Sequence, residues 1–183
     1  MDKKILLKIA RASILEEFEG KKLINKKELI NEFPFLNEER ATFVTLKIDG
    51  KLRGCIGSIL PRMSLIDDVI YNAKQAAFAD PRFEPLTPQE YEKIKIEISI
   101  LTIPQKLEYE DEKDLKIKIK PNIDGVILSL ADKQATFLPS VWEELPIFEL
   151  FFGHLCMKAG MSGDCLKYHP LIYTYQAQSV QED

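Results

Sequence analysis

The densest chemistry in this sequence lies in one short run, residues 52–58. Arg53 supplies a permanent positive charge and Cys55 a thiol, and both are candidate catalytic residues. A guanidinium next to a cysteine favours the thiolate, which is the nucleophilic form of the side chain. Gly54 and Gly57 leave the backbone bare, which suits a bulge or the close approach of a ligand. Free cysteine also commonly serves as a small buried hydrophobe, so a structural role for Cys55 is the alternative.

A β-hairpin is expected to position this run. Residues 42–48 are rich in β-branched and aromatic side chains, and Asp49-Gly50 follows as a hairpin turn signal. We expect a three-residue loop with a left-handed Gly50, which pairs Leu46 with Leu52 and places Val44 and Ile56 on their face. The opposite face then carries Phe43, Thr45, Arg53 and Cys55.

A second group of candidate residues lies in a proline-stiffened loop, Asp80-Pro81-Arg82-Phe83. Arg82 is suited to binding an anionic group, and we expect it to approach the Arg53–Cys55 strand. In the alternative, Arg82 only pairs with Asp80 or Glu84 while Phe83 fills the core.

Hydrophobic periodicity assigns most of the chain to helices and strands. Helices are expected at 4–18, 25–33, 65–77 and 146–159, with capping boxes that start short helices at Thr87 and Ser140. Strands are expected at 42–48, 52–58, 94–100, 115–119, 126–130, 135–138 and 171–176. We expect Ser179 to Asp183 to be a frayed polar end.

Composition bounds the class of protein. A chain of 183 residues with 45% hydrophobic residues fits one domain or two packed subdomains. The net charge of −4 indicates that nucleic acid is not a main partner. The N-terminus has no signal-peptide core, and no apolar run approaches bilayer length, so we expect a cytosolic protein without membrane contact. Three sparse cysteines favour reduced thiols.

Metal and cofactor sites are not expected. His154, Cys156, Cys165 and His169 are zinc-ligand types, but their spacing lacks a Cys-x-x-Cys knuckle, and Cys156 is placed on a buried helix face. The acidic loop 108–114 lacks a calcium-loop glycine pattern. There is no nucleophile elbow, phosphate-binding glycine loop or dinucleotide fingerprint, so no cofactor is predicted.

Four motifs, in order, carry a resemblance that covers almost the whole chain. They are Leu52-Arg53-Gly54-Cys55-Ile56-Gly57, Asp80-Pro81-Arg82-Phe83, Ala135-Thr136-Phe137-Leu138-Pro139 and Leu155-Cys156-Met157-Lys158-Ala159-Gly160. Together they resemble the AMMECR family, also called AmmeMemoRadiSam system protein A. The resemblance implies a cytosolic α+β fold, with an antiparallel or mixed sheet, flanking helices and two unequal subdomains that form a cleft near Cys55. It also implies a pathway shared with a Memo-type protein and a radical S-adenosylmethionine protein.

The matching positions define the candidate site. Beside Cys55 and Arg53, the resemblance implies substrate-binding roles for Gly54, Gly57, Asp80, Arg82, Phe83 and Lys158. Members commonly carry a late tryptophan where this chain has Cys165 or Leu166, which sets its C-terminal segment apart. Two hypotheses follow. In the first, the protein is an enzyme or enzyme component in which Cys55 is a nucleophile or covalent carrier, Arg53 or Arg82 holds a small anionic substrate, and the glycine amides stabilise developing charge. In the second, it is a non-catalytic adaptor whose cleft binds a partner protein.

Overall fold

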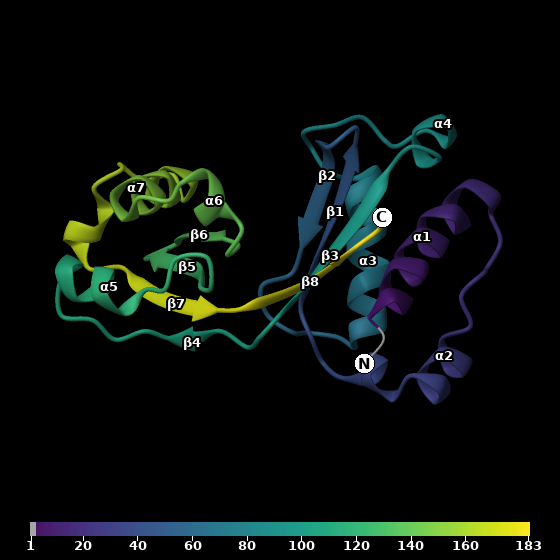
Figure 1. The fold of residues 1–183 in the computed structure, drawn as a ribbon, viewed down its shortest axis with the longest axis horizontal. Coiled ribbons are helices and arrows are strands. Elements are labelled where there is room, and N and C mark those ends of the chain that lie inside the picture. The colour runs from purple at the N-terminus through teal and green to yellow at the C-terminus, as the bar shows by residue number, and fades with distance from the viewer. Residues whose placement is uncertain (1–2) are drawn as a thin grey trace. The chain divides into compact units, whose positions relative to one another are not determined.

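The computed structural model describes residues 3–183 (Figure 1). The first two residues, which begin the stretch where no signal peptide is expected, lie outside this range. Helices and antiparallel sheets alternate along the chain, so the predicted α+β class is confirmed. Within residues 3–183, no helix is both long enough and apolar enough to cross a bilayer.

The chain divides into two compact units. The first contains residues 3–103 together with Gln178–Asp183, and the second contains Pro104–Ala177. The elements of the first are α1 (Lys4–Glu19), α2 (Lys26–Glu32), η1 (Pro34–Asn37), β1 (Thr42–Ile48), β2 (Lys51–Gly57), α3 (Leu65–Phe78), α4 (Pro88–Tyr91), β3 (Lys95–Leu101) and β8 (Ala177–Gln181). Those of the second are β4 (Gln105–Lys106), α5 (Glu112–Lys118), β5 (Gly125–Leu130), β6 (Lys133–Phe137), α6 (Val141–Glu144), α7 (Phe148–Lys158), η2 (Cys165–Tyr168) and β7 (Leu171–Tyr175).

The core of the first unit lies between two helices and one face of a four-stranded sheet. The strand order is β2-β1-β3-β8, and α1 and α3 pack against β1 and β3 (Figure 1). Fully buried sheet residues on this face are Val44, Leu46, Ile96 and Ile98. Each such side chain stabilises the fold by roughly 1.5–3 kcal/mol relative to exposure. The alanines of α3 face the sheet and allow a close approach.

The hairpin differs from its predicted register; Val44, Ile56 and Cys55 keep their predicted faces, while Leu52 lies opposite Lys47 on the other face from the one predicted. Asp49 and Gly50 both have positive φ angles, 51° and 74°, and form a two-residue turn rather than a three-residue loop. The extra residue is Arg53, which forms a bulge in β2, so the predicted Leu46–Leu52 pair is wrong. The prediction placed the extra residue in the turn, whereas the structure places it at Arg53. Both positions precede Cys55, so either one gives Cys55 the same face of the sheet. The observed pairs are Leu46 and Gly54, Thr45 and Cys55, and Val44 and Ile56.

A buried polar network joins α3 to the start of β1. The Asp68 side chain is fully buried, and its Oδ2 accepts hydrogen bonds from Thr42 N (2.7 Å), Thr42 Oγ1 (2.6 Å) and Asn72 Nδ2 (2.9 Å). Asn72 Nδ2 also donates to the Thr42 carbonyl and to Ser58 Oγ, just beyond the end of β2. Among residues 3–183, no group donates a hydrogen bond to the buried oxygens Asp68 Oδ1 and Asn72 Oδ1.

The predicted frayed end is wrong, because the last residues form strand β8 beside β3. Glu182 fixes this end of the chain. Its carboxylate accepts two hydrogen bonds from Arg11 at 2.7 and 2.6 Å and one from Ile96 N at 3.0 Å. The polar composition of 179–183 belongs to an edge strand, which is solvated along one side.

The strand predicted at 115–119 is wrong, because residues 112–118 form helix α5. Asp111 caps it by accepting from Asp114 N, and Lys118 pairs with Asp114 one turn away. Leu115 and Ile119 are buried while Ile117 is 81% exposed, so the burial has the helical spacing of four residues. The alternating isoleucine and lysine residues are compatible with both strand and helix periodicity. The Asp111 cap favours the helix.

The capping box predicted at Ser140 does not form, although α6 begins there. Ser140 has helical backbone angles, and its side chain makes no capping hydrogen bond. Tertiary packing holds this helix instead. The Trp142 ring stacks on Phe151 with 3.6 Å between centroids, and its Nε1 donates to the Asp124 carbonyl at 2.9 Å.

The cysteines correct another expectation. Cys156 lies on the buried face of α7 as predicted, but it is bonded to Cys165 in a disulfide, so these two are not reduced thiols. Cys55 is not part of a disulfide. Disulfides are rare in reducing compartments. The cysteine count therefore no longer supports a cytosolic location, which stays a prediction.

Thiol counting tests this disulfide. The unfolded protein without reductant is expected to give one reactive thiol, and three after reduction, because Cys55 is the one cysteine outside the disulfide. The measurement is titration with a chromogenic thiol reagent in denaturant. Finding three thiols in the unreduced chain, prepared without reductant, would contradict the disulfide.

Candidate functional site

Cys55 lies near the middle of β2, the outermost strand of its sheet. Its side chain is half-buried on the face opposite α1 and α3, and Cys55 Sγ lies 3.2 Å from Thr45 Oγ1 on the neighbouring strand. The predicted face of Cys55, which it shares with Thr45, is therefore confirmed, while their direct cross-strand pairing follows from the observed register. A hydroxyl at this distance can donate a hydrogen bond to a thiolate and favour it.

The two glycines of the motif make room for protein atoms. An ideal Cβ on Gly54 would lie 2.1 Å from the Ala76 carbonyl oxygen, so only glycine lets β2 approach α3 this closely. A Cβ on Gly57 would lie 2.3 Å from the ring of Phe43, its cross-strand partner. Both glycines therefore have a packing role, and their predicted contact with a ligand stays a prediction.

The Asp80 carboxylate binds the free edge of β2. It is almost fully buried, accepts a hydrogen bond from Cys55 N at 2.9 Å, and is paired with the Arg82 guanidinium at 2.7 Å. The hydrogen bond from Arg82, partly opposed by burial, holds the pKa of Asp80 well below its usual range. Asp80 therefore stays an anion and orients Arg82. A direct contact of Asp80 with substrate stays a prediction.

Arg82 approaches the Cys55 strand, as predicted. Its Nη2 donates to the Cys55 carbonyl at 3.2 Å, so Asp80 and Arg82 together satisfy both backbone groups of Cys55 on the open edge. Its side chain is still 53% exposed. Hydrogen bonding to Asp80 is the largest cause that raises the pKa of Arg82, and the charge of Cys55 adds to it. The guanidinium thus lies where it attracts an anion near the thiol.

Arg53 faces a different partner. Its Nε and Nη2 bind the two carboxylate oxygens of Glu90 at 2.8 and 2.9 Å, and Nη2 also donates to the Glu84 carbonyl. Hydrogen bonding from Arg53 and the amide of Thr87 lowers the pKa of Glu90 to about 2. This bidentate pair anchors α4 to β2. A role for Arg53 on substrate or thiolate stays a prediction, and the geometry favours Arg82 for both.

Phe83 lies between the two guanidinium groups. The Cζ atoms of Arg53 and Arg82 each lie 5.6 Å from its ring centroid. Cation–π contacts at this distance hold the ring and both cations in place. Each of the two hypotheses for the loop is therefore partly correct: Arg82 pairs with Asp80, and it also contacts the Cys55 strand.

Lys158 belongs to the second unit. It lies at the end of α7, where its Nζ donates to the Thr136 carbonyl at 2.9 Å and sits over the Phe137 ring. These contacts join two of the four motifs, Ala135 to Pro139 and Leu155 to Gly160. The predicted roles of Lys158 in substrate binding and of a cleft between the units stay predictions.

Among residues 3–183, no group of three or more histidine, cysteine, aspartate or glutamate side chains is placed to hold a metal ion. Two of the four candidate zinc ligands, Cys156 and Cys165, are bonded to each other. The ring of His169 stacks on Tyr109 at 4.3 Å.

A model of the AMMECR1 family matches residues 7–180. The chain belongs to the AMMECR1 family. A protein from Methanothermobacter thermautotrophicus is 39% identical over 186 residues, covering 97% of this chain and 93% of its own. One from Aquifex aeolicus is 32% identical over 190 residues, covering 100% and 93%. The crystal structure of uncharacterized protein PH0010 from Pyrococcus horikoshii matches with a TM-score of 0.88 and 33% identity, covering 98% of this chain and 90% of that one.

Two residues of this AMMECR1-family site were missed from sequence. Thr45 was placed on the correct face, but its contact with Cys55 depends on the bulge at Arg53. Glu90 was identified only as the capping residue of α4, and its second partner lies 37 positions earlier in the chain. The signal for that pair would have been a capping glutamate in one segment together with an arginine motif in another segment that has no acidic partner of its own.

Proposed function

We propose that the protein is an enzyme that uses the Cys55 thiolate as a nucleophile toward a small anionic substrate bound by Arg82. The observation that carries this proposal is a half-buried cysteine thiol outside any disulfide, beside a guanidinium that Asp80 orients and that remains half-exposed. Thr45 Oγ1 adds a hydrogen bond to the sulfur. These are the surroundings in which cysteine becomes reactive.

The proposed chemical step is the addition of the Cys55 thiolate to a carbonyl group of the substrate. The thiolate sulfur bonds to an electrophilic carbonyl carbon, and the displaced electron pair moves onto the carbonyl oxygen. Arg82 stabilises that charge or holds a second anionic group of the substrate. We further propose that this step takes place in the cytoplasm, in a pathway shared with a Memo-type protein and a radical S-adenosylmethionine protein, the partners that the sequence resemblance implies.

Alkylation kinetics test the nucleophile. At neutral pH, Cys55 in the native protein is expected to react with iodoacetamide faster than Cys55 in the urea-unfolded, unreduced chain, because only the fold supplies Arg82 and Thr45. Cys156 and Cys165 cannot interfere while bonded to each other. Cys55→Ser should remove the label and keep the unfolding midpoint nearly unchanged. A native thiol that reacts more slowly than the unfolded one would favour the adaptor, in which this surface binds a partner protein without chemistry.

A further inference from the structure

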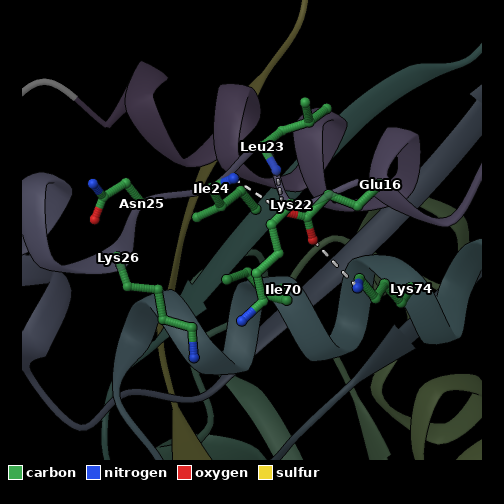
Figure 2. Close-up of a pocket in the computed structure, with 8 residues that line it drawn as sticks. All are labelled: Glu16, Lys22, Leu23, Ile24, Asn25, Lys26, Ile70 and Lys74. Carbon is green, nitrogen blue, oxygen red and sulfur yellow. Dashed lines mark hydrogen bonds and ion pairs between the residues drawn. The ribbon is translucent and has the colours of Figure 1, made fainter. Parts of the chain in front are cut away.

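A lysine-rich pocket lies in the first unit and shares no residue with the Cys55 site. It has a volume of about 670 Å³ and lies between α3 and the segment that joins α1 to α2 (Figure 2). Its lining includes Glu16, Lys22, Ile24, Lys26, Ile70 and Lys74. The volume falls within the usual range of small-ligand pockets.

The one carboxylate of this lining is already occupied. Glu16 Oε1 accepts hydrogen bonds from Leu23 N at 2.8 Å and Ile24 N at 3.0 Å, and Oε2 lies 3.5 Å from Lys74 Nζ. Burial alone would raise the pKa of Glu16, but the two amides and Lys74 lower it overall. Glu16 is therefore an ionised anchor that fixes the segment after α1 as one wall of the pocket.

The three lysines carry more positive charge than this lining neutralises. Lys22 has no hydrogen-bond or ion-pair partner among residues 3–183. Lys26 is paired with Asp67, and Lys74 is paired with Glu17 and more distantly with Glu16; of these three acids only Glu16 lines the pocket. Such partly exposed ion pairs contribute little and exchange readily, so an anion in the pocket can take up these ammonium groups.

Apolar side chains lie among the lysines. Ile24 and Ile70 are half-buried and face the pocket from opposite walls. Figure 2 shows Lys22 and Lys26 extending toward α3, where Ile70 and Lys74 lie. The pocket thus presents ammonium groups beside a small apolar surface. Inorganic anions would use the cations and leave this apolar surface exposed to water.

We propose that this lysine pocket binds a small organic phosphate, with the phosphate at Lys22, Lys26 and Lys74 and an apolar group on Ile24 and Ile70. Lysine ammonium groups bind phosphate oxygens as compact charges with several rotatable donors. Glu16 Oε1 is held by the backbone amides of the pocket wall, while Oε2 shares Lys74 and offsets part of the positive charge, so Lys22 and Lys26 provide most of the attraction for the phosphate.

Calorimetric titration with phenyl phosphate tests the proposal, with inorganic phosphate and benzyl alcohol as reference probes. Phenyl phosphate is expected to bind at one saturable site and more weakly as salt is added. Amide NMR signals of residues 22–26 should shift with the same saturation curve. Inorganic phosphate that binds as tightly as phenyl phosphate, or benzyl alcohol that does, would overturn the organic phosphate as the ligand.

Two matched lysine variants locate the site. Lys22→Met should weaken phenyl phosphate binding about tenfold, the effect of losing one charge-assisted hydrogen bond. Lys21→Met removes the same charge from the adjacent exposed residue outside the lining and should leave binding unchanged. Equal thermal midpoints would show that both variants are folded. Equal weakening by both variants, or the absence of saturable binding in the unmodified protein, would overturn the proposal.

Discussion

Gly54→Ala is expected to lower the free energy of unfolding by more than about 3 kcal/mol. The new methyl group would overlap the Ala76 carbonyl oxygen, which lies 2.1 Å from the ideal Cβ position. That oxygen belongs to the backbone of α3 and cannot rotate away. Strand β2 would have to leave the helix, and the core contact of Ile56 and the hydrogen bond from Cys55 N to Asp80 would be lost with it.

Two other glycines provide the controls for this prediction. Gly57→Ala meets the Phe43 ring, a side chain that can move, so a smaller loss of about 1–2 kcal/mol is expected. Gly153→Ala lies within α7 with its nearest neighbour 3.6 Å away, and it should stabilise by about 0.5–1 kcal/mol. Urea unfolding followed by circular dichroism measures all three. An unchanged midpoint for Gly54→Ala would mean that β2 and α3 are further apart than described.

Asp68→Ala is the second substitution with a large expected effect, a loss of about 3–5 kcal/mol. The side chain is fully buried and accepts hydrogen bonds from Thr42 N, Thr42 Oγ1 and Asn72 Nδ2. Alanine would leave those buried donors without their acceptor. It would also loosen the start of β1, to which the Asn72 amide links Ser58 at the end of β2.

Asp68→Asn is expected to stay close to the unsubstituted protein in stability. An amide oxygen can replace Oδ2, and the amide NH₂ would take the place of Oδ1, to which no group among residues 3–183 donates a hydrogen bond. Burial raises the pKa of Asp68 above 3.8. A raised folded-state pKa contributes stability that is present below 3.8 and lost as pH rises through the folded value. The asparagine variant should therefore gain stability relative to the unsubstituted protein as pH rises.

Urea unfolding at several pH values separates the two Asp68 variants. The expected result is a large loss for alanine at every pH and a difference for asparagine that becomes more favourable toward neutral pH. If asparagine is as damaging as alanine at neutral pH, the buried negative charge itself is required, and the carboxylate is held ionised by a group that balances it.

Local sequence signals predicted those elements whose ends and faces they specify. Gly20 ends α1 in a left-handed conformation, and Ser64 caps α3 by accepting from Asp67 N. Thr87 and Glu90 form a complete capping box. Prediction failed at 115–119, where one pattern fits two periods, and at 179–183, where a polar edge strand gains its stability from β3 and Arg11. Neither hydrophobic periodicity nor composition contains information about the pairing of residues 179–183 with β3, which is distant in sequence.

The candidate site shows the same division. The sequence placed Cys55, Thr45 and Arg82 near one another, because face alternation and a rigid loop constrain them. The sequence could not assign the partner of Arg53, because two arginines and several acidic residues can form alternative pairs. The observed pairs depend on the tertiary structure. The bonding of Cys156 to Cys165 likewise depends on how the chain turns after α7.

The most direct test of a reactive Cys55 beside Arg82 is the ratio of its alkylation rates with iodoacetate, an anion, and iodoacetamide, its neutral analogue. The ratio in the native protein is expected to exceed that in the unfolded chain by about fivefold, the effect of one nearby charge. Arg82→Gln should abolish this excess. Lys47→Gln, which removes a cation of the same sheet paired with Glu97, should preserve it. Equal ratios in the native and unfolded states, or an excess that survives Arg82→Gln, would contradict an anion site formed by Arg82 at Cys55.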